Sequence, residues 1–243
     1  MSPEPTSPNT APILITGGAQ RVGLHLCEQL LARGERIILT YRRERPVLDT
    51  LRAQGVITLQ ADFSTQEGVL AFVAALKQAT DSLRAIIHNA STWSKDATVL
   101  SEPAHFTELM NVHVFAPYWI NLHCEDLLRK GEGLRDIIAI SDHTVSRGSD
   151  KHAAYLASKA GLESLTLSFA KRFAPRIKVN AIAPALVMFN EGDSAEYRTE
   201  RLKRSALQIE PGPGVVFDAV WYLLHSSYTT GTILPLNGGR HLV

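Results

Sequence analysis

Residues 13–23 read ILITGGAQRVG, a short apolar run followed directly by a glycine-rich turn. The run has the composition of a buried strand, and a helix is expected after the turn. Such a helix aims its N-terminal N–H groups at a bound anion, and glycine lets the backbone come close. The turn is therefore a candidate pyrophosphate site, with Gly17, Gln20, Arg21, Val22 and Gly23 as its ligands. A purely structural strand-to-helix turn is the alternative.

The alternation of short apolar runs and longer amphipathic stretches continues along the chain. Six further runs are typical of strands: 36–39, 56–59, 85–87, 137–140, 178–182 and 232–234. Strands that alternate with helices are typical of a parallel sheet joined by crossover helices. We therefore expect one α/β domain over residues 12–243, a Rossmann-like doubly wound parallel sheet of about seven strands with helices on both faces.

Composition narrows the class of protein. The 243 residues carry 25 Lys and Arg against 24 Asp and Glu, so no overall charge favours nucleic acid or an anionic membrane. No apolar run approaches the roughly 20 residues that span a bilayer. Cys27 and Cys124 lack the spacing of a zinc site and fit buried side chains in a reducing compartment. We expect a cytoplasmic protein without a bound metal and without a nucleic-acid or membrane partner.

Two segments depart from the strand-helix pattern. Residues 1–11 are rich in Pro, Ser and Thr and lack the features of a secretory signal, so we expect a flexible leader. Residues 185–213 carry clustered charges and a Pro-Gly-Pro-Gly string. Because open α/β sheets bind ligands at the carboxyl ends of their strands, this second segment is a candidate substrate lid. An ordinary variable loop with one short helix is the alternative.

The end of the second expected strand bears on the choice of cofactor. An acidic residue there would hydrogen-bond the ribose of NAD but repel the 2′-phosphate of NADP. The sequence has Thr40-Tyr41-Arg42-Arg43, with two guanidiniums that can grip a phosphate through paired donors. It therefore predicts NADPH, with Tyr41, Arg42 and Arg43 among its ligands. A solvated arginine pair at the start of a loop is the alternative.

Tyr155 and Lys159 are four residues apart in a stretch typical of a long helix, so both side chains lie on one face. A free tyrosine has a pKa near 10, and proton transfer at neutral pH would need that pKa to fall by about 3, or roughly 4 kcal/mol. We expect the Lys159 ammonium to supply much of this shift. For such a string alone, a surface pair is the ordinary explanation.

Taken together, the motifs resemble those of the short-chain dehydrogenase/reductase family, over nearly the whole chain from Ala11 onward. They are, in family order, Thr16-Gly17 with Gly23, Asp62, Asn89-Ala90, Tyr155 with Lys159, Asn180 and Pro184. The resemblance implies that Asp62 and Phe63 flank the adenine and that Lys159 binds the nicotinamide ribose and assists Tyr155. It also implies that Asn89, Ala90 and Pro184 line the cofactor, and that the protein is a homotetramer.

Several positions depart from the pattern of most family members. Arginine replaces a glycine of the phosphate turn, aspartate replaces the serine thirteen residues before the tyrosine, and serine replaces the glycine after Asn89-Ala90, with tryptophan close behind. These residues are Arg21, Asp142, Ser91 and Trp93. They resemble the pteridine reductase branch of the family.

That resemblance implies a site for a reduced pterin. Arg21 would lie near the cofactor phosphates and the pterin, Ser91 and Asp142 would contact the pterin, and Trp93 would stack on it. A flat heteroaromatic ring with donors and acceptors on one edge suits an indole and a carboxylate. Alternatively, Trp93 could be a lid or interface aromatic, Asp142 could cap a loop, and Arg21 could pair with a neighbour.

The branch's chemistry implies hydride delivery from NADPH to C6 of a 7,8-dihydropterin, with a proton reaching N5. Dihydrofolate, with the same ring and a larger tail, could be a slower substrate. Four strings resemble one bacterial group within the branch: 88–91, 147–152, 189–191 and 238–242. A general carbonyl reductase and a non-catalytic NADPH-binding regulator remain alternatives, although intact Tyr155 and Lys159 argue against the regulator.

One further residue is ambiguous. By its spacing to Ala116-Pro117, His113 takes the position where many family members have an asparagine that holds a structural water. A histidine can still bind water or relay a proton. A histidine that only packs in the core is the alternative.

Overall fold

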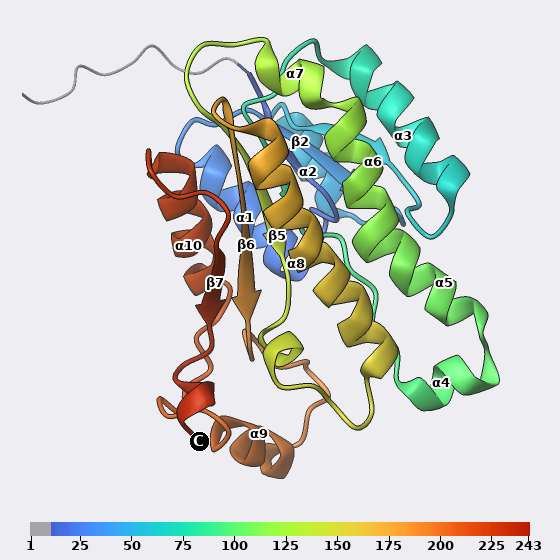
Figure 1. The fold of residues 1–243 in the computed structure, drawn as a ribbon, viewed down its shortest axis with the longest axis vertical. Coiled ribbons are helices and arrows are strands. Elements are labelled where there is room, and N and C mark those ends of the chain that lie inside the picture. Colours follow the sequence, from blue (N-terminus) through green and yellow to red (C-terminus); the bar gives the residue numbers. More distant parts are fainter. Residues whose placement is uncertain (1–10) are drawn as a thin grey trace, which may run out of the picture.

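One parallel sheet forms the centre of the molecule (Figure 1). The computed structural model describes residues 11–243. Seven strands pair in parallel in the order β3-β2-β1-β4-β5-β6-β7. The strands are β1 Ile13–Ile15, β2 Ile37–Tyr41, β3 Ile57–Gln60, β4 Ala85–His88, β5 Arg135–Ile140, β6 Ile177–Pro184 and β7 Ile233–Leu236. The expected fold class is confirmed, while the expected leader, apart from Ala11, lies outside the described residues.

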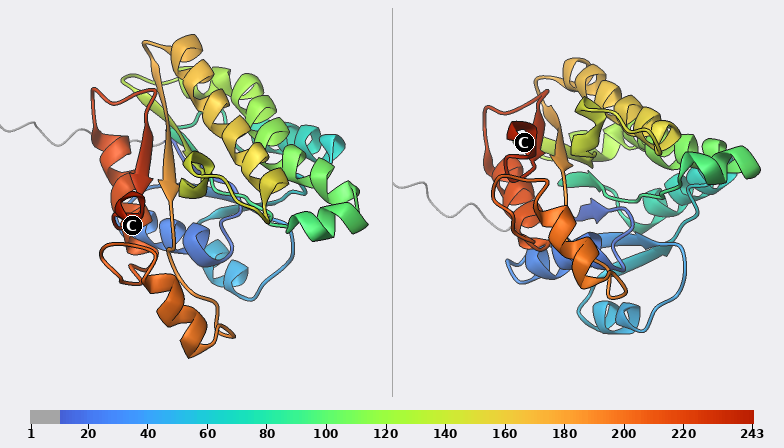
Figure 2. Two further views of the ribbon diagram at one scale, coloured as in Figure 1. Left: turned by 60° about the horizontal axis from the view of Figure 1, so that its bottom comes forward. Right: turned by 90° about the horizontal axis from the view of Figure 1, so that it is seen from below.

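Helices cover both faces of this sheet, as Figures 1 and 2 show. Alternate strand residues point to opposite faces, so Ile13 and Ile15 join one apolar core while Leu14 joins the other. The first core includes side chains of α1 Arg21–Leu31, α2 Val47–Ala53 and α10 Gly214–His225. The second includes side chains of α3 Gln66–Ala79, α6 Ala116–His123 and α8 Ala153–Phe173.

Shorter elements connect these layers. They are α4 Asp96–Ser101, α5 Ala104–Met110, the π-helical turn η1 Asn111–Phe115, α7 Glu125–Arg129, the 3-10 turn η2 His143–Ser146, α9 Ala195–Leu202 and the 3-10 turn η3 Arg240–Leu242. The turn η1 joins α5 to α6 and packs against α8. The candidate lid, residues 185–213, contains α9 as its one helix, and its role as a lid stays a prediction.

The amino ends of the central strands carry buried charges. Asp136 of β5 is fully buried and forms ion pairs with Arg84 (2.6 Å) and with Lys178 of β6 (2.8 Å). Charged residues that are paired in this way can be buried at the start of a strand. β5 therefore begins two residues before the apolar run 137–140 that predicted it. The charged residues at the amino ends of the strands therefore stabilise the fold. The carboxyl ends of the strands remain available for a binding site.

The two cysteines are buried and free, as expected. Burial raises the pKa of each thiol to about 12, which keeps both protonated at neutral pH. Within residues 11–243, no helix has the length and apolar character needed to cross a membrane.

Candidate active site

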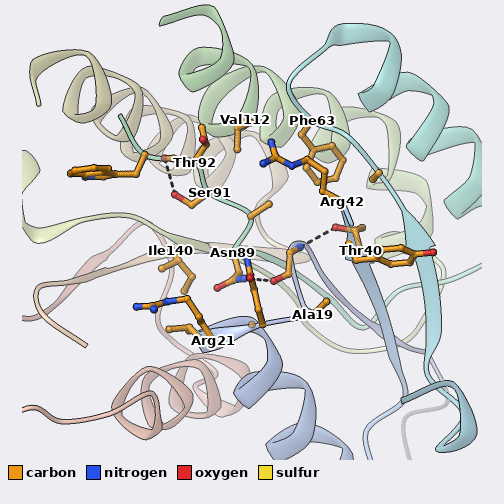
Figure 3. A pocket seen from close by; sticks show the side chains of 18 of the residues that line it. Ala19, Arg21, Thr40, Arg42, Phe63, Asn89, Ser91, Thr92, Val112 and Ile140 are labelled. Carbon is orange, nitrogen blue, oxygen red and sulfur yellow. Dashed lines mark hydrogen bonds between the residues drawn. The ribbon is translucent and has the colours of Figure 1, made fainter. Parts of the chain in front are cut away.

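A cavity of about 580 Å³ opens at the carboxyl ends of the strands, where the strand order reverses between β1 and β4 (Figure 3). Every site residue predicted from the sequence lines it: Gly17, Gln20, Arg21, Val22, Gly23, Tyr41, Arg42, Arg43, Asp62, Phe63, Asn89, Ala90, Ser91, Trp93, Asp142, Tyr155, Lys159 and Pro184. Sequence reasoning missed a further set of lining residues: Ala19, Thr40, Arg45, Ala61, Thr92, Val112, Ile140, Ser141 and Ala185. Among these, Arg45 follows the arginine pair by two residues and was the one detectable from its charge.

The phosphate turn is held in place from β4. Asn89 donates its side-chain amide to the carbonyls of Thr16 and Gly17, each at 3.0 Å, and the Gly17 N–H donates to Thr40 Oγ1 at 3.0 Å (Figure 3). A Cβ on Gly23 would overlap the Gly17 carbonyl oxygen and crowd the Asn89 amide. The turn therefore depends on glycine at position 23, because α1 packs directly under it.

Arg21 begins α1 with a φ of +50°, in the left-handed region that glycine adopts freely. The backbone thus has a conformation that favours glycine, although the residue is arginine. Its Nη1 donates to Asn190 Oδ1 at 2.8 Å. Arg21 therefore links the phosphate turn to the candidate lid through an amide rather than through an acidic neighbour. Apart from this contact, only Ala185 of the lid reaches the cavity lining.

Three arginines follow β2 along the cavity: Arg42, Arg43 and Arg45. Arg42 is half exposed and pairs with Glu108 at 3.3 Å. Burial opposes ionisation of Asp62, but hydrogen bonds from Ser64 and the charge of Arg42 leave its pKa below the ordinary value. This end of the cavity therefore carries net positive charge.

Tyr155, Asp142 and Lys159 meet at the other end of the cavity. The Tyr155 hydroxyl donates to Asp142 Oδ2 at 3.2 Å, while Asp142 Oδ1 accepts the Thr144 N–H at 2.7 Å. Asp142 thus caps η2 with one oxygen, as the alternative for this residue expected, and lines the cavity beside Tyr155 with the other, while its contact with a pterin stays a prediction. Lys159 Nζ donates to the Ile140 carbonyl at 2.8 Å.

The expected lowering of the Tyr155 pKa is wrong for this arrangement. Burial and then the Asp142 carboxylate raise the pKa of Tyr155 far above its ordinary value. The Lys159 ammonium lies 5.9 Å from the centre of the tyrosine ring and is held by a carbonyl instead. Tyr155 is therefore a neutral O–H donor. Burial lowers the pKa of Lys159 to about 8, although Asp142 and Glu163 oppose this change.

Trp93 stands at the mouth of the cavity with 56% of its surface exposed. Its ring packs on His152 with 4.7 Å between centroids and a 43° tilt. Asp96, three residues on, accepts the N–H groups of Ala153 (2.8 Å) and Ala154 (3.1 Å) at the start of α8. The loop that carries Trp93 is thereby fixed to the helix that carries Tyr155.

The described residues contain no cluster of three or more His, Cys, Asp or Glu side chains placed to hold a metal ion. His113 lies outside the main cavity lining, with 1% of its surface exposed, and contacts Ser91 from behind.

Comparisons with known proteins agree with the family that the sequence motifs resemble. The family model described as enoyl-(acyl carrier protein) reductase matches residues 17–241. Dihydromonapterin reductase of Enterobacter sp. (strain 638) is 50% identical over 234 residues, which covers 95% of this chain and 97% of that protein. The protein of the same name from Klebsiella pneumoniae subsp. pneumoniae is 48% identical over 232 residues, with the same coverage.

Among solved structures, the FolM alternative dihydrofolate reductase 1 from Brucella canis, complexed with NADP, superposes with a TM-score of 0.86 at 26% identity and covers 97% of this chain and 95% of its own. The relatives that share half of the residues agree with the pteridine reductase branch expected from Arg21, Ser91, Trp93 and Asp142. On the sheet order, the full-length match and these relatives, the chain belongs to the short-chain dehydrogenase/reductase family.

Proposed function

We propose that this protein uses NADPH to reduce a 7,8-dihydropterin to the tetrahydropterin, with dihydromonapterin as the favoured substrate and dihydrofolate as a slower one. The observation that carries the proposal is the convergence of Arg21, Ser91, Trp93 and Asp142 on the one cavity that also holds Tyr155. The dihydromonapterin reductases that are 48–50% identical to this chain support it.

The cavity fits a nicotinamide dinucleotide. It extends from the glycine turn, where a Cβ on Gly17 would meet Ala90 Cα at 2.9 Å, to the Tyr155–Asp142 pair. Residues 20–23 at the start of α1 line this cavity and would receive the pyrophosphate, and Asp62 and Phe63, which line it too, would flank the adenine. Lys159 would hold the nicotinamide ribose.

The charge beside β2 favours NADPH over NADH. Arg42, Arg43 and Arg45 can hold a 2′-phosphate through charge-assisted hydrogen bonds, and the strand ends without a carboxylate. Replacing Arg42 and Arg43 by alanine should weaken NADPH binding by at least tenfold and change NADH binding little, because each hydrogen bond to a charged group is worth about 1.5–3 kcal/mol. Fluorescence titration with both cofactors checks this, and equal losses would contradict the assignment.

When bound, NADPH supplies the hydride that C6 of the dihydropterin receives. Trp93 would stack on the flat pterin ring. The Arg21 side chain, from the phosphate turn, would lie beside the same ring. The proton that must reach N5 would come from solvent and pass through the Tyr155–Asp142 pair, in which the Tyr155 hydroxyl donates to Asp142 Oδ2 at 3.2 Å. Hydride and proton together saturate the C6–N5 double bond.

The direct test is NADPH oxidation measured side by side with dihydromonapterin, dihydrobiopterin, dihydrofolate and a panel of ketones. We expect kcat/KM to be highest for dihydromonapterin and lower for dihydrofolate. Faster turnover of ketones would identify a general carbonyl reductase. NADPH binding without oxidation by any dihydropterin would identify a regulator.

We also propose a homotetramer assembled through the outer faces of α5, α6 and α8. Phe106, Tyr118 and Leu167 expose 45%, 41% and 46% of their surfaces on these helices. The Tyr118 ring lies 5.9 Å from that of the buried Phe169 on α8, so α6 and α8 pack together beneath these exposed side chains. Exposed apolar surface of this kind is typical of an interface.

For the location of the protein we propose the cytoplasm. The free, buried Cys27 and Cys124 suit a reducing compartment, and NADPH chemistry would operate there. Fractionation of cells that express the protein, with the reductase assay on each fraction, would test this.

A further inference from the structure

His113 lies directly behind Ser91, in the π-helical turn η1, and is fully enclosed. Its Nε2 is 2.9 Å from Ser91 Oγ and 3.3 Å from the Thr92 backbone nitrogen. On the other side of the ring, Nδ1 is 2.8 Å from Ser158 Oγ. The imidazole therefore joins the loop after β4 to α8 beneath the site.

These partners fix which ring nitrogen carries the hydrogen. The Thr92 N–H can only donate, so Nε2 must be an acceptor. The Ser158 hydroxyl donates to the Tyr155 carbonyl at 2.7 Å, so its oxygen is left to accept from Nδ1. Both neighbours require the neutral tautomer with hydrogen on Nδ1. Burial, followed by the charge of Lys159, lowers the pKa of His113 to about 2, which agrees with a neutral ring.

The tautomer in turn sets the direction of the Ser91 hydroxyl. With Nε2 as acceptor at 2.9 Å, the single Ser91 hydrogen points to His113, away from the cavity. Two other acceptors lie near this hydroxyl: the Thr92 carbonyl in Figure 3, which is farther away at 3.4 Å, and the Tyr155 oxygen, to which the Ser91 hydroxyl can also donate. The Ser91 oxygen, which lines the cavity, is therefore left with its lone pairs for a ligand.

We propose that His113 is a positioning residue that fixes the Ser91 hydroxyl as a hydrogen-bond acceptor and so selects ligands that present an N–H donor to it. The inference rests on the proposed dihydropterin substrate, whose 2-amino group and N3–H are such donors. Asp142 Oδ2 is a second acceptor in the same cavity. A ketone carbonyl, which can only accept, finds no donor at Ser91.

Two substitutions at position 113 separate this role from packing. Glutamine can place its carbonyl oxygen where Nε2 lies, whereas the shorter asparagine side chain ends near Nδ1 and leaves Ser91 without its acceptor. His113→Asn should raise KM for dihydromonapterin about tenfold with little change in kcat, and His113→Gln should restore most of the loss. NADPH affinity should stay near wild type in both variants, whereas Tm should fall in His113→Asn, because the part-buried Thr92 N–H loses its acceptor, and fall less in His113→Gln. A wild-type KM for His113→Asn would overturn the proposal.

A double-mutant cycle with Ser91→Ala shows whether His113 acts through Ser91. Once the hydroxyl is gone, His113→Asn should change KM by less than about twofold. Wild-type protein should also bind pterin at least about tenfold more tightly than analogues lacking the 2-amino group or the N3–H, and both single variants should lose that preference. Additive effects on KM would overturn the proposal, because they would mean that His113 acts independently of Ser91.

The pterin-binding measurement distinguishes the role of His113 from the proposed reductase activity. Measured on protein saturated with NADP⁺, it requires no turnover. Donor-selective pterin binding without reduction of any dihydropterin would retain the role of His113 and refute the reductase. Reduction without donor selectivity would do the reverse, and absence of pterin binding would refute both.

Discussion

At the scale of single residues, Arg21 combines an unfavourable backbone with a useful side chain. Its φ of +50° costs roughly 1 kcal/mol for a residue with a Cβ, while its guanidinium reaches Asn190. A residue that strains the backbone at a ligand-facing position is expected where function requires its side chain.

Arg21→Gly should therefore separate stability from substrate binding. We expect the free energy of unfolding to stay level or rise by up to about 1 kcal/mol, while KM for dihydropterin rises about tenfold. Urea unfolding and steady-state kinetics measure the two effects. Asn190→Ala is the matched control, since it removes the same hydrogen bond and leaves both the strain and the guanidinium. A less stable Arg21→Gly with unchanged KM would contradict this account.

Lys159 gives a pH dependence whose sign follows from its pKa of about 8, against an ordinary 10.5. The ammonium is present below pH 8 and is lost above it, so kcat should fall as pH rises through about 8. The unfolded chain binds more protons between pH 8 and 10.5, so the cost of burying the Lys159 ammonium is relieved and the stability of the fold rises with pH over that window. The loss of rate therefore cannot be unfolding caused by Lys159.

The kcat profile of Lys159→Arg provides the check. A guanidinium stays charged beyond pH 12, so this variant should lack the falling limb near pH 8, whatever its absolute rate. A wild-type rate that is flat to pH 10 would show that the charge of Lys159 is not needed.

The sequence identified which residues form the site but not how they are protonated. Tyr155 with Lys159 could be found from spacing, yet the direction of the Tyr155 pKa depends on burial and on Asp142, which only the folded chain brings together. The cap that Asp142 Oδ1 forms on η2 could be assigned only in the folded chain, and its contact with a pterin stays a prediction. His113 was ambiguous because Ser158 and Thr92 lie far from it in sequence.

At the scale of elements, the phosphate turn depends on the close approach of α1 to β1 and β4. Gly23 lies against the Gly17 carbonyl and the Asn89 amide, whereas Gly192 in the candidate lid has open space around it. Two glycines of similar appearance in the sequence thus have unequal roles.

Gly23→Ala should shift the turn and weaken NADPH binding by more than tenfold, because the added methyl displaces the backbone that faces the pyrophosphate. Gly192→Ala should bind NADPH as wild type does. Isothermal titration of both variants tests this, and normal affinity in Gly23→Ala would show that the turn adjusts without loss.

The seven strands could be predicted from the sequence. The start of β5 and the π-helical turn η1 could not. The apolar runs located all seven strands, because a fully buried parallel strand is continuously apolar. The start of β5 was missed because Arg135 and Asp136 are charged, although folding buries both. The π-helical turn η1 leaves no signal in the pattern, since one extra residue per turn changes neither composition nor length.

At the scale of the whole molecule, the amino and carboxyl ends of the parallel strands have different roles. Asp136 with Arg84 and Lys178 holds the strands at their amino ends, and the cavity occupies their carboxyl ends. The outer faces of α5, α6 and α8 lie away from both and present the apolar surface proposed for assembly (Figure 1).

Leu167→Glu should disrupt that assembly, because it would place a charge in an apolar contact. Light scattering should give four times the 26.7 kDa chain mass for wild type and a lower multiple for the variant. Leu100→Glu, the same change at an exposed position on α4, is the control and should leave the mass unchanged. A monomeric wild type would exclude the tetramer.

In the proposed reaction, this site passes a hydride from NADPH to C6 of a dihydropterin. The most direct measurement uses NADPH carrying deuterium at both C4 positions, with 7,8-dihydromonapterin as acceptor and NMR of the product. We expect tetrahydromonapterin with one deuterium, located at C6. A product without deuterium at C6, or no product from any dihydropterin, would contradict it.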